Sequence, residues 1–272
     1  MGTSGNLTRR LFLERSAGVL GATLTLGSGI AAFAQEVPEE FYPPNANLYD
    51  FILPRVSSIL PDWDFGPGGD ENFVRRLGEE FGMRVRQSNG VRDMVPMNGK
   101  PDDFNACVNL SSLDSLNRYP VLFMSGTGKW VLPGDHAKNL KDYVLGGGFV
   151  FMDECAAPAL EDDFYNSALS CLVNLFENEA VLPVPEDHVI YSNVYDIKSQ
   201  GFKSFKRPNG VHPDMGVFLD GRLAVYLDNA DLHCGWLDPK DTFIKRTLHE
   251  EGMQRGLNLF SYFLSYHKPA EI

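Results

Sequence analysis

The sequence predicts an α/β protein with a doubly wound, mostly parallel sheet and an antiparallel hairpin at its edge. Residues 119–126 (YPVLFMSG) and 149–154 (FVFMDE) are almost wholly apolar, as is typical of strands covered on both faces. A helical pattern at 133–148 joins these two runs, which predicts a right-handed crossover between parallel strands. Farther along, two strand-like runs meet at Asp220-Gly221, a strong signal for a hairpin.

The elements before this unit are expected to be shorter. Residues 48–56 (LYDFILPRV) predict the first strand, with Pro54 at its end. A helix is expected from Asp70, whose side chain can cap it, to Gly82, which ends it. Short strands are expected at 83–88 and 107–110.

Two long amphipathic helices are expected after the crossover. The first spans 161–177, and the second begins at Thr247 and Glu250, which have the spacing of a capping box. Apolar residues recur at helical spacing in both, so each helix is expected to cover a face of the sheet. The residues expected to face inward are Phe164, Ala168, Cys171, Leu172 and Leu175 in the first helix and Leu257, Phe260, Phe263 and Leu264 in the second.

The first 34 residues have the features of a twin-arginine export signal. Arg9 and Arg10 precede a weakly apolar run, and the run ends in a small-x-small cleavage site at Ala34. The alternative, an uncleaved membrane anchor, is disfavoured because the run is rich in Gly and Thr. We therefore expect export by the twin-arginine translocation machinery to the periplasm or another extracytoplasmic space.

The rest of the chain is expected to form one domain. Residues 35–47 predict an acidic, Pro-rich linker, 48–267 the α/β domain and 268–272 a short tail. The whole chain has a net charge of −12, and removal of the signal leaves about −14. Nucleic-acid binding is not expected of so acidic a protein. No run after the signal is long and apolar enough to predict a transmembrane span.

Four cysteines remain after the signal, and their pairing is open. Cys107, Cys155, Cys171 and Cys234 allow three complete sets of disulfides, which the sequence does not rank. The absence of a C-x-x-C pair disfavours a zinc ribbon or finger. No motif requires a cofactor.

The chain resembles DUF4159, a family of domains of unknown function grouped with the class I glutamine-amidotransferase-like, flavodoxin-like folds. The stretches that carry the resemblance run from about residue 50 to 265: FILPRV, DENFVRRL after Trp63, YPVLFMSGTGKWVL, NLKDYVLGGGFVFMDE, PEDHVIYSNVYDI, GRLAVYLDNADLHCGW and RGLNLFSYFL. The resemblance implies the fold, but it does not imply an activity.

Cys155 follows a predicted strand, at the place where glutamine amidotransferases carry their nucleophile. The amidotransferase turn is Gly-x-Cys-x-Gly, whereas this chain lacks both glycines and places two acids directly before the cysteine. Negative neighbours disfavour the reactive thiolate, which favours an inert or disulfide-bonded thiol. The alternative is a nucleophile that uses His188 or His249 as its base, with Glu251 beside the latter.

Asp153 and Glu154 end a central strand, where open α/β sheets bind their ligands. They are expected either to cap the next helix or to accept hydrogen bonds from a sugar-like or polyol ligand. The loop after the neighbouring strand is expected to form the facing wall, through Ser125, Gly126, Thr127 and Lys129. Its spacing excludes a phosphate-binding P-loop.

Two further segments contain candidate ligand-binding residues. Asp187-His188 offers an acid/base or metal group, and a metal held by Asp153, Glu154 and His188 is one possibility for a hydrolase. In DNADLHCGW (228–236), Asp231 and Trp236 are candidates for the rim of a sugar site, but a core tryptophan beside an aspartate in a turn is the favoured alternative. A strand there would send the neighbouring residues His233 and Cys234 to opposite faces.

Together these features favour a noncatalytic domain that binds a polar small molecule or a protein partner. The alternative is a hydrolase or amidase, which would use Cys155 with a histidine or a bound metal ion.

Overall fold

A computed structural model describes residues 40–57, 63–88, 100–155, 162–177, 180–200, 213–238, 240 and 246–266. The predicted export signal, residues 35–39 of the predicted linker and the tail lie outside these ranges.

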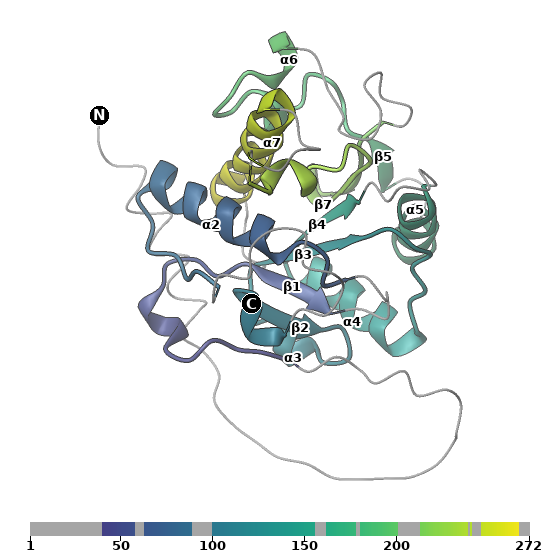
Figure 1. Ribbon diagram of the computed structural model, residues 1–272. Coiled ribbons are helices and arrows are strands. Elements are labelled where there is room, and N and C mark those ends of the chain that lie inside the picture. Colours follow the sequence, from purple (N-terminus) through teal and green to yellow (C-terminus); the bar gives the residue numbers. More distant parts are fainter. Residues whose placement is uncertain are drawn as a thin grey trace.

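The centre of the molecule is a mixed seven-stranded sheet in the order β2-β1-β3-β4-β7-β6-β5 (Figure 1). The first five strands in this order are parallel, and β6 and β5 form an antiparallel edge. The strands are β1 (Pro54–Ser57), β2 (Ala106–Asn109), β3 (Val121–Gly126), β4 (Phe149–Glu154), β5 (Val181–Pro183), β6 (Met215–Leu219) and β7 (Arg222–Asp228). The predicted α/β class, the mostly parallel sheet and the antiparallel edge are therefore confirmed.

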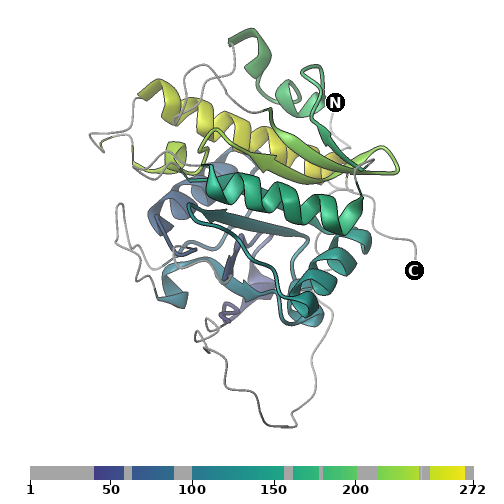
Figure 2. The same ribbon diagram turned by 90° about the vertical axis from the view of Figure 1, so that its right-hand side faces the viewer.

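Helices cover both faces of the sheet, as a doubly wound fold requires. Helices α2 (Pro67–Phe81) and α7 (Arg246–Tyr266) lie on one face, and α4 (Gly134–Leu145) and α5 (Asp163–Phe176) lie on the other. Figure 2 shows α5 running across its face of the sheet. The short helices α3 (Leu113–Leu116) and α6 (Ile197–Gln200) and the 3-10 turns η1 (Ala46–Leu48), η2 (Pro101–Asp103), η3 (Val189–Tyr191) and η4 (Cys234–Trp236) lie in the connections.

Each face of the sheet has its own apolar core, because side chains alternate along a strand. In β4, Phe149 and Phe151 pack with α2 and α7, whereas Val150 and Met152 pack with α4 and α5. Each strand of this central part is buried on both sides, which explains its continuous apolar sequence.

The predicted crossover and hairpin are confirmed. Strand β3, helix α4 and the parallel strand β4 follow one another within the expected ranges. Asp220 and Gly221 join β6 to β7, and both have positive φ, as a type I′ turn requires.

Several predicted boundaries were wrong because tertiary contacts decide them. Pro54 begins β1 rather than ending it, since β1 is set by its pairing with Ala106–Asn109. Helix α2 begins at Pro67 after Gly66, and Asp70 does not cap it but forms an ion pair with Arg55. Residues 83–88 contain only the single bridge of Val85 to Phe51.

The two long helices also differ in detail from the prediction. In α5, Cys171 and Leu175 are only partly buried, and Tyr165 and Phe176 face inward instead. Helix α7 already includes Arg246, so Thr247 lies inside the helix rather than at its cap. Glu250 accepts a hydrogen bond from Gln254 and forms an ion pair with Arg76, a different role from a capping box.

The described part of the predicted linker packs against the domain. Phe41 exchanges two backbone hydrogen bonds of 3.0 Å with Cys107, and its ring lies under the guanidinium of Arg86. Glu40 accepts a hydrogen bond from Ser115. Residues 40–47 therefore belong to the folded unit.

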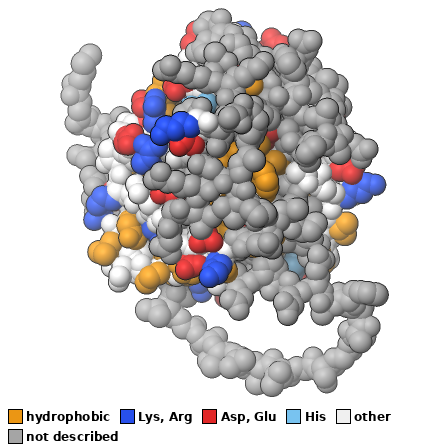
Figure 3. Space-filling model, in the orientation of Figure 1, with side chains coloured by type: hydrophobic (Ala, Val, Ile, Leu, Met, Phe, Trp, Pro, Cys, Tyr) orange, Lys and Arg blue, Asp and Glu red, His pale blue; other side chains and the backbone are white. Residues whose placement is uncertain are grey.

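The surface of the described chain has charges of both signs. Figure 3 shows Lys and Arg side chains lying beside Asp and Glu side chains, and α2 contains two such pairs, Arg75–Glu79 and Arg76–Glu80. Among the helices that the structure describes, none has the length and apolar character needed to cross a membrane.

A buried polar site at the carboxyl edge of the sheet

Polar side chains replace apolar ones where the central strands end. Ser125 of β3, Asp153 of β4 and Asp228 of β7 lie side by side in the register of the sheet. Because Asp153 follows Phe149 and Phe151 at two-residue spacing, its side chain lies on the same face as theirs, the face covered by α2 and α7. The carboxyl edge on this face is therefore a row of buried polar groups.

The segment 229–237 folds back over this row, and hydrogen bonds to Asp153 hold it there. Its carboxylate accepts hydrogen bonds from the backbone N–H groups of Leu232 (2.8 Å) and His233 (3.2 Å). Burial, followed by the nearby charge of Asp231, raises the pKa of Asp153 to about 8, although these two N–H groups oppose the rise. The predicted ligand acceptor thus has a structural role: it positions the segment that carries Asp231 and Cys234.

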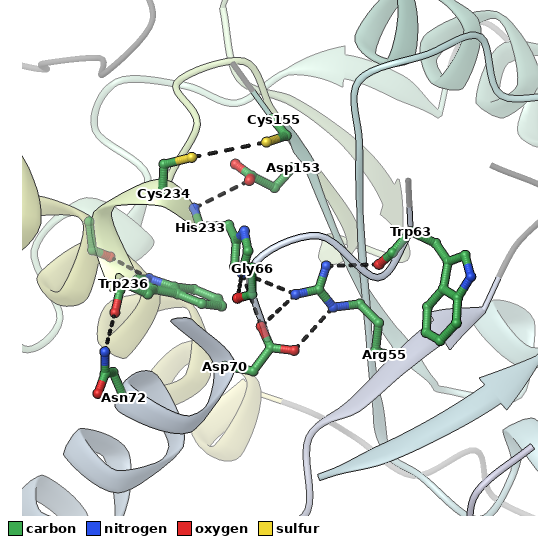
Figure 4. A network of polar contacts seen from close by, with 11 residues as sticks. Arg55, Trp63, Gly66, Asp70, Asn72, Asp153, Cys155, His233, Cys234 and Trp236 are labelled. Atoms are coloured by element: carbon green, nitrogen blue, oxygen red, sulfur yellow. Dashed lines mark hydrogen bonds and ion pairs between the residues drawn. The ribbon is translucent and has the colours of Figure 1, made fainter. Parts of the chain in front are cut away.

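Cys234 of this segment lies beside Cys155, which follows β4 (Figure 4). The Sγ atoms of Cys155 and Cys234 lie 4.0 Å apart, and both side chains are about 3% exposed. A carboxylate oxygen of Asp231 completes a group in which the three ligand atoms lie within 4.8 Å of one another. The contact with Cys155, burial and Asp231 raise the pKa of Cys234 well above that of an ordinary thiol.

Beside the thiols lies a buried ion pair between β1 and α2 (Figure 4). Arg55 donates to both carboxylate oxygens of Asp70, at 2.6 and 3.1 Å, and to the carbonyl oxygen of Trp63 at 3.1 Å. Its guanidinium also lies 4.6 Å from the centre of the Phe123 ring. Burial would raise the pKa of Asp70, but the charge of Arg55 and the hydrogen bond with His233 hold it below its ordinary value.

His233 belongs to this ion-pair network. Its Nε2 atom lies 3.0 Å from the carbonyl oxygen of Gly66 and 3.2 Å from Asp70 Oδ1. The same atom also lies 3.0 Å from Arg55 Nη2, which is a donor, so Nε2 either donates to an oxygen or accepts from Arg55 according to the tautomer. Burial, followed by the charge of Arg55, lowers the pKa of His233, so the imidazole is neutral near pH 7.

The start of α2 provides space for this imidazole. A Cβ atom on Gly66 would lie 2.8 Å from the His233 ring, and one on Gly69 would lie 3.0 Å from it. Gly66 also has a φ of +66°, which disfavours any side chain. His233 and Cys234 do point in different directions as expected, but from a 3-10 turn rather than from a strand.

Glu154 points to the other face of the sheet and caps α5. Its carboxylate accepts a hydrogen bond of 2.5 Å from the backbone N–H of Tyr165, in the first turn of that helix. The capping alternative for this acid is therefore the one that the structure supports.

The predicted loop after β3 lies next to these groups. The N–H of Cys155 donates to the carbonyl oxygen of Gly126 at 3.0 Å, which joins the ends of β3 and β4. Ser125 is buried, Thr127 is partly exposed and Lys129 is exposed. Thr127 and Lys129 are therefore more exposed to solvent than the other predicted binding residues at this edge, Asp153, Glu154 and Cys155, which are buried.

His188 lies near the opposite end of the sheet. Its Nδ1 atom accepts from the N–H of Ile190, and its ring packs against Phe218 and Tyr262. Phe218 pairs with Leu223 at the start of β7, whereas Cys155 follows the end of β4. The structure thus separates His188 from Asp153, Glu154 and Cys155, which contradicts both the metal set and the base predicted with it. Asp187 is exposed beside His188.

The remaining predicted residues lie on or under α7. His249 is in the first turns of the helix, with a buried Nδ1 atom that has no hydrogen-bond partner among the described residues, and Glu251 is buried. Trp236 is completely buried: its ring stacks on Phe73 at 4.0 Å, and its Nε1 donates to the carbonyl oxygen of Gly252. Trp236 is a core residue rather than the rim of a sugar site.

Two charged networks were missed from the sequence. Arg55 stands in an otherwise apolar stretch, FILPRV, and a charge in such a run is a signal of a buried ion pair. The second network is centred on Asp214, which accepts hydrogen bonds from Tyr191 (2.6 Å), Tyr226 (2.6 Å) and Arg255 (2.8 Å). Its residues come from four separate segments, and no local pattern identifies them.

The fold and this edge define an α/β protein with a mixed sheet and a buried polar site that contains a pair of thiols. The chain belongs to the family described as "Domain of unknown function (DUF4159)", whose model matches residues 52–264. The resemblance seen in the sequence is therefore confirmed at the level of the family. No curated protein matches the chain.

Proposed function

We propose that this chain is an exported, noncatalytic domain that binds a polar small molecule at the carboxyl edge of its sheet. The single observation that carries the proposal is the position of the histidines. A cysteine nucleophile needs an imidazole beside it. His188 caps η3 near the other end of the sheet, and the ring of His233 is hydrogen-bonded to Gly66 and Asp70. The Nδ1 atom of His249 has no hydrogen-bond partner among the residues that the structure describes, so it makes no hydrogen bond to Cys155.

The order of the strands supports the position of the ligand. The chain passes from β1 to β2 on one side and then returns to β3 on the other side, so the direction of winding changes between β1 and β3. Open α/β sheets bind ligands at the carboxyl ends of the strands at such a point. The loop Ser125–Lys129 begins there, and it includes two hydroxyl groups and an exposed ammonium group.

The chemistry of this loop favours a ligand with several oxygen atoms, such as a polyol or a sugar. Asp153 and Glu154 accept hydrogen bonds from backbone N–H groups, so they position the segments around the edge. The polar atoms of the ligand are then contacted by Ser125, Thr127 and Lys129. We also propose that the domain shares the class I glutamine-amidotransferase-like fold and that the twin-arginine signal delivers it to the periplasm.

A thermal-shift assay tests the binding proposal on the mature chain, residues 35–272, with glycerol, glucose and N-acetylglucosamine as probes. At least one probe is expected to raise the Tm in a concentration-dependent way, because a ligand present at 100 times its Kd stabilises the folded state by about 2.7 kcal/mol. The Lys129→Ala variant is expected to lose this shift. The matched control is Lys138→Ala, an exposed lysine of α4.

Two results would contradict the proposal. One is that none of the probes shifts the Tm of the wild type. The other is that Lys129→Ala responds as the wild type does, which would place the ligand elsewhere. A protein partner in place of a small molecule would give the first result.

A further inference from the structure

We propose that Cys155, Cys234 and Asp231 form a binding site for a thiophilic divalent metal ion of the zinc class. This inference goes beyond the binding of a polar molecule, because its ligands are different residues at the same edge. It rests on the geometry of three buried side chains that come together from two segments of the chain.

The distance between the two sulfur atoms suits a shared metal ion. A zinc ion binds thiolates at about 2.3 Å, so two sulfurs on one tetrahedral ion lie about 3.8 Å apart. The two Sγ atoms are 4.0 Å apart, close to that separation. The Asp231 oxygen lies within 4.8 Å of both, so a single ion can contact all three atoms after small side-chain movements.

The chemistry of the donor atoms selects the metal. Two thiolates favour zinc and other thiophilic ions over magnesium and calcium, which prefer oxygen ligands. When the ion binds, the S–H bonds of both cysteines break, two metal–sulfur bonds form, and two protons pass to the solvent. Three protein ligands leave the fourth position of a tetrahedral ion for water or for a ligand atom.

The structure holds these ligands in place from two directions. Cys155 is fixed by the end of β4, through its N–H bond to the Gly126 carbonyl oxygen. The segment with Asp231 and Cys234 is fixed by the two hydrogen bonds that it donates to Asp153. Asp153 is therefore a positioning residue for this site.

The position of Asp231 is also specific. Its backbone has a φ of +60°, in the left-handed region that few residues other than glycine adopt. The side chain is buried beside the thiols, and one of its oxygen atoms lies within 4.8 Å of both sulfur atoms.

Titration with Co²⁺ tests this site in the mature chain, after reduction of the thiols and removal of bound metal with EDTA. We expect one equivalent to bind and to give the thiolate-to-cobalt charge-transfer absorption of a two-sulfur site, which Zn²⁺ then displaces. Cys234→Ser is expected to remove about half of this absorption. It is also expected to weaken binding by more than the roughly 10- to 100-fold loss typical of residues outside the first ligand shell.

Two further variants complete the test. Asp231→Asn is expected to weaken binding while the charge-transfer absorption remains. Cys171→Ser, at a partly buried position of α5 away from these ligands, is the matched control and is expected to bind Co²⁺ as the wild type does. Zinc-edge X-ray absorption of the wild type gives the number of sulfur ligands without any substitution, and two are expected.

The proposal is overturned if the reduced wild type binds no cobalt, or if Cys234→Ser leaves the absorption unchanged. A reduced chain that takes up no metal and oxidises to a Cys155–Cys234 disulfide would assign the pair a redox or structural role instead. The thermal-shift assay with metal-free protein is independent of these results, so failure of the metal site is distinguishable from failure of the proposed binding function.

Discussion

Arg55 is a buried charged residue beside the carboxyl edge of the sheet. Its side chain is about 1% exposed, and its charge is balanced by Asp70 in a bidentate pair. Removal of one partner of such a pair leaves a buried charge without compensation, which costs far more than the pair itself contributes. The orientation of His233, and through it the segment 229–237, depends on the same pair.

The Arg55→Met variant is expected to lower the free energy of unfolding by about 3 to 5 kcal/mol, because Asp70 loses its counter-charge in the interior. Urea unfolding at pH 7 measures the change. The matched control is Arg75→Met, since Arg75 is half-exposed in its pair with Glu79 and the loss there is expected to be below about 1 kcal/mol. Equal losses in the two variants would contradict the assigned role of Arg55.

The lowered pKa of Asp70 predicts a specific pH dependence. Between its folded pKa and its unfolded value of about 3.8, the unfolded chain binds more protons than the folded chain does. The stabilisation due to the Asp70 charge is thus complete above pH 3.8 and is lost as the pH falls through the folded pKa. The difference in unfolding free energy between wild type and Asp70→Asn should therefore be constant near neutral pH and decrease below about pH 4.

Chemical unfolding of the two proteins from pH 7 to pH 3, in EDTA, measures this difference. Glu79→Gln serves as the control, because its exposed carboxylate should give a difference that stays near zero. A difference for Asp70→Asn that grows in acid would reverse the sign and contradict the lowered pKa.

The contact between the turn η4 and the helix α7 depends on two glycines, Gly235 and Gly252. A Cβ atom on Gly252 would lie 3.0 Å from the Cα of Gly235 and 3.0 Å from the carbonyl oxygen of Leu232. Backbone atoms on both sides leave no space for a methyl group. This close approach also places Trp236, whose Nε1 donates to the carbonyl oxygen of Gly252.

Gly252→Ala is therefore expected to lower the free energy of unfolding by about 1 to 3 kcal/mol, the usual cost of overpacking. It should also weaken Co²⁺ binding, because η4 carries Cys234. Gly134→Ala is the control: this glycine begins α4, nothing lies within 4 Å of a Cβ atom there, and alanine favours the helix by up to about 1 kcal/mol. A Gly252→Ala protein as stable as the wild type would contradict the packing described.

The elements that could be predicted are those that local pattern determines. The crossover from β3 to β4 and the Asp220-Gly221 hairpin follow from apolar runs, helical spacing and turn chemistry within the segments themselves. The start of β1 and the role of Asp70 could not be predicted, because they depend on pairing with β2 and on Arg55. Both are determined by contacts between residues far apart in the sequence.

The proposed metal site is formed by residues that lie far apart in the sequence. The sequence identified Asp153 and Cys155 in one segment and Asp231 and Cys234 in another, but as separate candidates. The two cysteines are 79 residues apart, and only the fold of segment 229–237 onto β4 brings their sulfur atoms together. No periodic pattern in the sequence indicates such a contact between two distant segments, so it could not be predicted.

The thiol of Cys155 is one half of a buried thiol pair, and we propose that it is not a catalytic nucleophile. The most direct measurement is the rate of Cys155 alkylation by iodoacetamide from pH 5 to pH 10, followed by peptide mass spectrometry of the reduced, metal-free mature chain. We predict a rate that stays low through neutral pH and rises only in the alkaline range, as for an unactivated thiol. Rapid alkylation of Cys155 with a plateau below pH 7 would contradict the account, because it would require a positively charged partner that activates the thiol.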